Sequence, residues 1–124
     1  MRDFVGRLFC DGVALMAVDA TELDRLFEVI ASRKGADAST SYSAKLMAGG
    51  PALCARKLGE EAIEMVIAAL GTDRNAVISE SADLLYHWLV TLAATGVTPS
   101  EVYSELARRE GRSGLDEKAS RGQG

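Results

Sequence analysis

Apolar residues recur at intervals of three and four along most of this chain, a spacing that predicts helices rather than strands. The first such stretch begins at Thr21, a residue type that caps helices, and extends to about Lys34, just before Gly35. Its apolar residues fall on one stripe, namely Leu23, Leu26, Phe27 and Ile30. We therefore expect an amphipathic helix over residues 21–34.

Two longer helical patterns follow, with a very short connection between them. The first begins near Pro51, which suits the first turn of a helix, and ends at Leu70 before Gly71. The second covers residues 73–95, and Gly96 closes it. A connection this short predicts that the two helices form an antiparallel hairpin.

The remaining segments are shorter. Residues 36–50 are mostly polar, and we expect a loop there with one helical turn over residues 44–48. Thr98 and Glu101 form a capping box around a proline, which predicts a last helix to about Arg109. Because strand signals are nearly absent, we predict an all-α fold: an antiparallel helical hairpin with flanking helices, in a bundle completed by dimerisation.

At 124 residues, the chain has the length of one domain. We expect an N-terminal extension over residues 1–20, whose structure the pattern leaves open, and a folded domain over residues 21–110. Residues 111–124 have almost no apolar side chains, which predicts a disordered tail. The net charge of −4 argues against general affinity for nucleic acid, although a metal ion could bring a phosphorylated substrate to an acidic pocket.

The cysteines and the apolar runs bear on the cellular compartment. Cys10 and Cys54 show no C-x-x-C spacing, so we expect no disulfide framework, and Cys54 lies in a helical pattern as a buried, reduced thiol. No apolar run is long enough to span a bilayer. We therefore expect a cytoplasmic protein with neither a membrane nor a nucleic-acid partner.

Acidic residues interrupt both helices of the predicted hairpin. Glu60, Glu61 and Glu64 share one face of the first helix, and Glu80 and Asp83 share one face of the second. Antiparallel packing would bring the two groups level with each other. Carboxylates gathered in one pocket are costly unless a cation neutralises them, and magnesium prefers oxygen ligands. The pattern therefore predicts a magnesium site.

A simpler interpretation is that these acids face water, as acidic residues at helical spacing usually do. Two observations weigh against it. Residues 82–94 are apolar nearly all round the helix, which indicates burial on most sides. The acids also have almost no cationic partner one turn away, Lys57 with Glu61 being the one candidate pair, whereas a solvated face usually mixes charges of both signs.

The two acidic motifs in this order resemble those of MazG-like all-α nucleotide pyrophosphohydrolases. The surrounding residues are similar to the phosphoribosyl-ATP pyrophosphatase family in these segments: Ser41-Tyr42-Ser43-Ala44-Lys45-Leu46, Gly50-Pro51, Lys57-Leu58-Gly59-Glu60-Glu61-Ala62, Val66-Ile67-Ala68-Ala69 and Ala82-Asp83-Leu84-Leu85-Tyr86-His87. The resemblance covers roughly residues 22–110. Each short motif is a weak signal alone, but the whole set in order is a strong one.

This resemblance implies magnesium-dependent hydrolysis of phosphoribosyl-ATP to phosphoribosyl-AMP and pyrophosphate, the second step of histidine biosynthesis. It also implies roles for the acids. Glu61, Glu64, Glu80 and Asp83 would be metal ligands, and Glu60 and Glu61 would be catalytic. Whether Glu60 is a further ligand or the base that orients the attacking water stays open at this point.

Positive groups should meet the phosphates of such a substrate. We predict that Lys45 and Lys57 bind substrate, together with Tyr42 and Ser41 of the polar loop.

Three other polar residues have simpler interpretations. His87, one turn after Asp83, is better interpreted as a satisfied core histidine than as a substrate ligand. Arg33 and Lys34 are better interpreted as solvated bases that complement the C-terminal dipole of their helix.

Two other functions and one assembly also remain as hypotheses. One alternative is a MazG-like hydrolase of free nucleoside or deoxynucleoside triphosphates. The other is a non-catalytic helical module that binds metal. The apolar hairpin, with Trp88 and Leu92, carries more apolar surface than one short chain can cover, which predicts a homodimer.

Overall fold

The computed structural model describes residues 18–112 and 114–122, and within these residues every regular element is a helix. The predicted all-α fold is thus confirmed. The helices are α2 (Thr21–Ser32), α3 (Tyr42–Ala48), α4 (Gly50–Leu70), α5 (Arg74–Thr95), α6 (Pro99–Arg109) and α7 (Gly114–Gly122). Most of the predicted N-terminal extension, including Cys10, lies outside the described residues.

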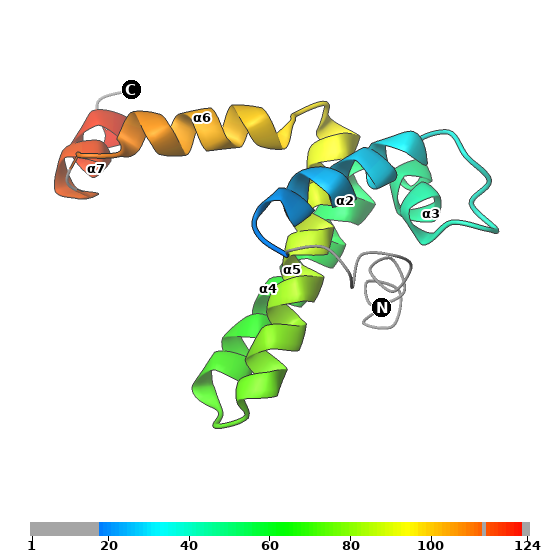
Figure 1. Ribbon diagram of the computed structural model, residues 1–124, viewed down its shortest axis with the longest axis horizontal. Helices are drawn as coiled ribbons and strands as arrows, with labels where there is room; N and C mark the ends of the chain where they lie inside the picture. Colours follow the sequence, from blue (N-terminus) through cyan, green and yellow to red (C-terminus); the bar gives the residue numbers. More distant parts are fainter. Residues whose placement is uncertain (1–17, 113, 123–124) are drawn as a thin grey trace.

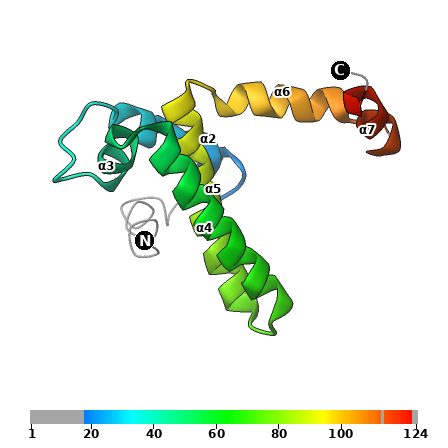
Figure 2. The ribbon, with the colours of Figure 1, turned by 180° about the vertical axis from the view of Figure 1, so that it is seen from behind.

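The predicted hairpin is the centre of the fold. Helices α4 and α5 lie side by side and antiparallel in both views, joined at one end by a tight turn after Leu70 (Figures 1 and 2). At the other end, α2 packs across α5, and α3 packs against both hairpin helices. Helix α6 leaves this end and extends away from the hairpin, with α7 beyond it (Figure 1). The tip of the hairpin therefore has no flanking helix among the described elements.

Local hydrogen bonds determine where α5 and α6 begin. The Asp73 carboxylate caps α5 by accepting the Asn75 backbone N–H at 3.0 Å. The Thr98 hydroxyl caps α6 by accepting the Glu101 backbone N–H at 3.3 Å, which confirms the first half of the predicted capping box. Gly96 ends α5 with a φ of 77°, a left-handed conformation that glycine adopts without steric cost.

The prediction that Thr21 caps α2 is wrong by one residue. The cap position is Ala20, whose side chain has no hydrogen-bonding group, and Thr21 is already helical. The carboxylate of Asp19 does the capping instead, by accepting both the backbone N–H of Thr21 at 2.9 Å and its hydroxyl at 2.6 Å. Aspartate is as good a cap as threonine, so the start of α2 is still capped by a side-chain oxygen.

The core lies where α2 and α3 meet the C-terminal half of α5. The buried apolar cluster comprises Leu26, Ile30, Leu46, Cys54, Tyr86, Leu89, Val90, Leu92 and Ala93. The predicted buried thiol is confirmed: Cys54 is free, its Sγ lies 3.3 Å from the Leu46 carbonyl oxygen, and burial raises its pKa. Half of the predicted α2 stripe, Leu26 and Ile30, is buried in this cluster.

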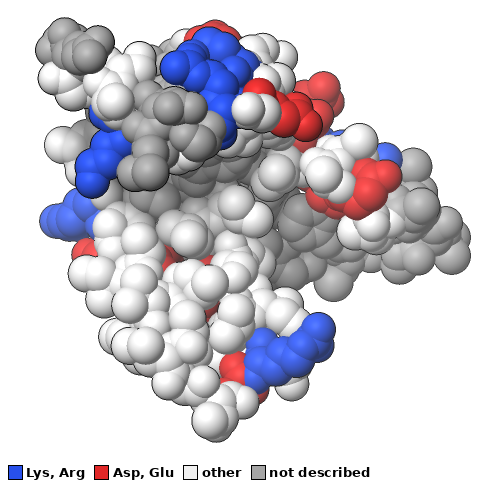
Figure 3. Space-filling model, turned by 90° about the vertical axis from the view of Figure 1, so that its left-hand side faces the viewer, with Lys and Arg blue, Asp and Glu red and all other residues white. Residues whose placement is uncertain are grey.

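Helix α4 does not have the buried apolar face that its sequence suggests. Of its residues, all of which the structure describes, only Cys54 and Glu61 are buried. Its large apolar side chains point to solvent instead: Ile63, Val66, Ile67 and Leu70 are 62%, 58%, 64% and 84% exposed. In Figure 3 the hairpin occupies the lower part of the molecule, and its surface there is largely uncharged. The helix is rotated so that Glu61 faces α5 together with Met65, while these larger apolar side chains face away from it.

The predicted disordered tail differs in the structure, which has α7 over Gly114–Gly122. Good helix formers such as Lys118 and Ala119 favour helix locally. All of the α7 side chains that the structure describes are exposed, so this helix adds nothing to the core. None of the described helices combines the length and apolar character needed to cross a bilayer.

Candidate active site

Acidic side chains from the two hairpin helices meet on their facing sides. Glu61 and Glu64 of α4 and Glu80 of α5 each offer a carboxylate oxygen, and these three oxygens lie within 4.8 Å of one another. Glu61 and Glu64 share a face of α4 because they are three residues apart, and antiparallel pairing places Glu80 opposite them. We call these residues the carboxylate cluster.

Burial determines what the carboxylate cluster can bind. Glu61 is 9% exposed and Glu80 is 4% exposed, whereas Glu64 faces solvent. Like charges held this close in a partly dry site repel each other, and a divalent cation relieves that repulsion. Carboxylate oxygens are the donors that hard divalent cations take, so the residues present fit such an ion. Asp83, one turn further along α5, is 2% exposed, but its oxygens do not join the group.

Glu60 lies outside the carboxylate cluster. One carboxylate oxygen lies 3.4 Å from the Lys57 ammonium nitrogen, and the other lies 3.9 Å from Nε of Arg56. The predicted pairing of Lys57 with Glu61 is therefore wrong. Because Glu61 turns inward to α5, its exposed neighbour Glu60 takes the lysine instead.

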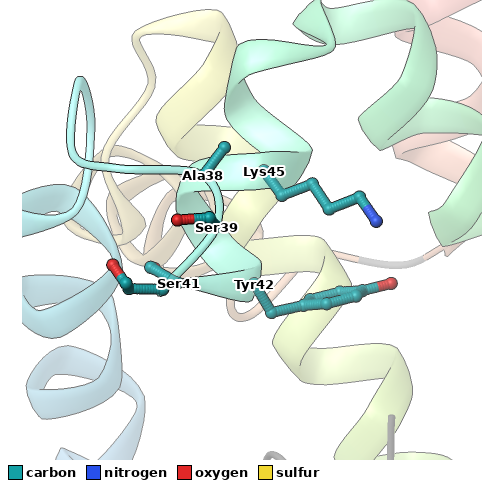
Figure 4. Close-up of a pocket in the computed structure, with 6 residues that line it drawn as sticks. Ala38, Ser39, Ser41, Tyr42 and Lys45 are labelled. Carbon is teal, nitrogen blue, oxygen red and sulfur yellow. The ribbon is translucent and has the colours of Figure 1, made fainter.

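The loop before α3, together with α3 itself, forms a pocket of about 610 Å³. Its lining residues are Ala38, Ser39, Thr40, Ser41, Tyr42 and Lys45. Ser41, Tyr42 and Lys45, which the sequence predicted to bind substrate, thus share one pocket, whereas Lys57 lies on α4. Figure 4 shows the Tyr42 and Lys45 side chains extending from α3 side by side in the same direction.

Tyr42 lies between this pocket and the acidic face of α4. Burial raises the pKa of its hydroxyl, the Lys57 ammonium opposes that rise, and the carboxylates of Glu61 and Glu60 add to it. Charged groups perturb a pKa in this way only at short range, so the tyrosine is close to both signs of charge. The pocket and the carboxylate cluster are therefore neighbouring parts of one surface.

A buried hydrogen bond holds α3 on α5. The hydroxyl oxygens of Ser43 and Tyr86 lie 2.6 Å apart, and these residues are only 2% and 0% exposed. Ser43 directly follows the pocket residue Tyr42, so this bond sets where the pocket lies relative to the acids of α5. This bond could not be predicted from the sequence, because a contact between residues 43 positions apart leaves no periodic signal.

Tyr86→Phe is expected to lower the free energy of unfolding by about 1–3 kcal/mol, because it keeps the ring but leaves the buried Ser43 hydroxyl without its partner. Chemical denaturation of this variant, of Ser43→Ala and of the double variant tests the claim. The double variant should lose less than the sum of the two single losses. Strictly additive losses would contradict a direct bond.

His87 differs from its predicted role. It is 0% exposed, and neither ring nitrogen has a hydrogen-bond partner among the described residues. The prediction of a satisfied core histidine is therefore right about burial and wrong about hydrogen bonds. The ring packs edge-on against Tyr86 and Tyr42, with centroids 5.2 Å and 6.4 Å away. Burial lowers the pKa of His87 to about 4, and the Lys57 ammonium adds to this effect.

This depressed pKa predicts a loss of stability in mild acid. Between the ordinary pKa of 6.5 and the native pKa of about 4, the unfolded chain binds a proton at His87 that the folded chain does not. The free energy of unfolding should therefore be insensitive to this group above pH 6.5 and fall by about 3 kcal/mol as the pH drops to 4. Comparison with His87→Gln isolates this contribution from that of the carboxyl groups.

The native titration can be measured directly, since His87 is the only histidine in the sequence. Its imidazole C–H resonances in a proton NMR titration give the pKa of the folded state. A value near 6.5 would contradict the burial described above.

Comparisons with known proteins agree with this arrangement. The model of a family described as phosphoribosyl-ATP pyrophosphohydrolase matches residues 23–110, which include both the carboxylate cluster and the α3 pocket. A phosphoribosyl-ATP pyrophosphatase from Parvibaculum lavamentivorans is 68% identical over 108 residues, covering 87% of this chain and 99% of the relative. One from Paracoccus denitrificans is 62% identical over 101 residues, covering 82% and 94%. The chain therefore belongs to the phosphoribosyl-ATP pyrophosphohydrolase family.

Proposed function

We propose that this chain hydrolyses phosphoribosyl-ATP to phosphoribosyl-AMP and pyrophosphate, with magnesium as cofactor, as the second step of histidine biosynthesis. The observation that carries the proposal is the convergence of the Glu61, Glu64 and Glu80 carboxylate oxygens within 4.8 Å of one another. Membership of the family supports the choice of substrate.

The acidic residues have two different roles, binding magnesium and activating water. Glu61, Glu64 and Glu80 hold magnesium. The buried Asp83 lies one turn further along α5, outside this group of oxygens, and we propose it as a further ligand because the family resemblance implies that role. When bound, magnesium neutralises negative charge on the triphosphate as the bond between the α and β phosphates breaks. Glu60 is exposed and lies outside the group of ligands. We therefore assign it the task of orienting the attacking water and accepting its proton.

Cationic and hydroxyl groups bind the rest of the substrate. Lys57 is held beside Glu60, at a nitrogen–oxygen distance of 3.4 Å, and meets the triphosphate there. Ser41, Tyr42 and Lys45 supply a second binding region in the α3 pocket. The two regions together place the reacting phosphates against the carboxylate cluster, and this positioning is a large part of what catalysis of phosphoryl transfer requires.

A direct assay tests the function. The protein is incubated with magnesium and phosphoribosyl-ATP, and the release of pyrophosphate is measured, with ATP and deoxynucleoside triphosphates in parallel. We expect rapid release from phosphoribosyl-ATP and little from the free triphosphates. Hydrolysis of the free triphosphates alone would indicate a MazG-like housecleaning enzyme. Thermal stabilisation by magnesium without release from any nucleotide would indicate a non-catalytic metal-binding module.

We also propose that the enzyme is a homodimer. The hairpin exposes several large apolar side chains, those of α4 described above and Ile78 of α5 at 53% exposure. No described helix covers the tip of the hairpin (Figure 2). A second copy of the same face would bury these side chains and turn the hairpin into a four-helix bundle.

A further inference from the structure

The two lysines predicted to bind substrate have different surroundings. Lys57 lies on α4 and is paired with Glu60 beside the acids. Lys45 lies on α3, is exposed, and its ammonium group forms no ion pair with any residue that the structure describes. Lys45 thus offers a full positive charge in a separate pocket that has no metal-binding group of its own.

Hydroxyl groups line the same pocket, but Figure 4 shows the Ser39 and Ser41 side chains on the opposite side from the Lys45 ammonium group. Ser39 donates its hydroxyl proton to the Asp37 carboxylate at 2.8 Å, and Thr40 donates its own to the Asp37 carbonyl at 3.1 Å. Ser41 instead accepts the backbone N–H of Ala44 at 3.2 Å, so its hydroxyl proton remains to be given. The positive charge of the pocket therefore comes from Lys45, which extends beside Tyr42 in Figure 4, and an ammonium group suits a phosphate.

The proposed substrate carries two separate anionic groups, and this step of the argument rests on the proposed function. Its triphosphate belongs at the carboxylate cluster with magnesium. The phosphoribosyl group attached to the purine carries a second phosphate, and the five acids near the cluster would repel that phosphate unless it had its own cation. Tyr42 lines the pocket beside Lys45, and its hydroxyl is affected by the charges of Lys57, Glu61 and Glu60, so a purine that joined the two anionic groups would meet this ring.

We propose that Lys45 binds the 5′-phosphate of the phosphoribosyl group. Lys45 is then the residue that distinguishes phosphoribosyl-ATP from ATP, since ATP lacks this phosphate and leaves the pocket empty. The α3 pocket is a specificity pocket, and the buried bond between Ser43 and Tyr86 holds it at a fixed position relative to the acids of α5.

The test compares the two nucleotides in Lys45→Gln, Lys45→Arg and wild type. We expect Lys45→Gln to raise the KM for phosphoribosyl-ATP by about 10- to 100-fold, the value of a hydrogen bond to a charged group, with a smaller change in kcat. The inhibition constant of ATP, measured as a competitor and so independent of its turnover, should stay within about twofold of wild type. Lys45→Arg should recover most of the loss.

Lys34→Gln serves as the matched control, because it removes the same charge from an exposed position outside the pocket. This control variant should leave both the KM for phosphoribosyl-ATP and the inhibition constant of ATP unchanged. Equal weakening of ATP and phosphoribosyl-ATP by Lys45→Gln would overturn the proposal and place Lys45 on the triphosphate. The proposal would also be overturned if Lys45→Gln weakened the binding of neither nucleotide. A wild-type protein that releases no pyrophosphate from phosphoribosyl-ATP would instead refute the function on which the proposal rests.

Discussion

Glu61→Gln should lower kcat/KM for phosphoribosyl-ATP by about 10²- to 10³-fold, a loss typical of removing one charged group that stabilises a transition state. Glu61 is 9% exposed and is the one buried member of the carboxylate cluster on α4. Because it is buried, a side chain that faces solvent cannot take over its position. Glutamine keeps the shape of the side chain but removes its charge and weakens the binding of a hard cation. Glu80→Gln, from the facing helix, should behave in the same way.

The folding stability of Glu61→Gln, unlike its activity, should not fall. Without magnesium, removing one of several crowded carboxylates relieves repulsion, so Glu61→Gln should unfold at the same temperature as wild type or at a higher one. Adding magnesium should stabilise wild type more than the variant, because only wild type keeps the full set of ligands. Thermal unfolding with and without magnesium measures both effects and does not depend on activity.

Glu28→Gln provides the matched control for this prediction. Glu28 is an exposed acid on α2, outside the carboxylate cluster, and its substitution should change neither activity nor the response to magnesium. A folded Glu61→Gln enzyme with full activity would show that the site lies elsewhere. Loss of activity together with an unchanged response to magnesium would remove Glu61 from the set of ligands.

The second large effect concerns the apolar face of α4. Ile67→Asp should convert the dimer into a monomer, because Ile67 is 64% exposed on the single chain and a charge there would be buried in the interface. Central interface residues typically contribute at least ~2 kcal/mol, which corresponds to a dissociation constant about 30-fold weaker or more. Light scattering over a range of protein concentrations measures the change in mass. The melting temperature should fall as well, because a dimer is stabilised by its own concentration.

Leu106→Asp is the control for the dimer. Leu106 lies on α6 and is 61% exposed, nearly as much as Ile67, but it is not part of the hairpin. It should leave the molecular mass unchanged. A wild-type protein that is monomeric at micromolar concentration would refute the dimer, and an Ile67→Asp variant that remains dimeric would place the interface on another face.

The helices were predictable from the sequence because their signals are local. Gly71 and Gly96 stop the two hairpin helices where predicted, and the bounds of α4 and α5 agree with prediction to within one residue. Helical spacing alone put Glu61 and Glu64 on one face. The sequence could not separate Glu60 from Glu61, since the two are adjacent and both look equally acidic on a helical wheel.

The rotation of α4 about its own axis distinguishes Glu60 from Glu61. Helix α4 turns Glu61 toward α5, so Glu60 is left to Lys57 and the apolar side chains such as Ile67 face solvent. A wheel drawn from one helix assumes that the apolar arc faces the core, and this assumption fails for α4, whose large apolar side chains face solvent in the single chain.

The sequence by itself determined the helices, their order and the family, because helix propensity, capping and motif spacing are properties of neighbouring residues. Only the tertiary structure decided which acids converge, that His87 is buried without a hydrogen-bond partner among the described residues, and that Ser43 meets Tyr86. These contacts depend on how whole helices rotate and pack. Packing free energy is shared among many side chains distant in sequence, and no short motif records it.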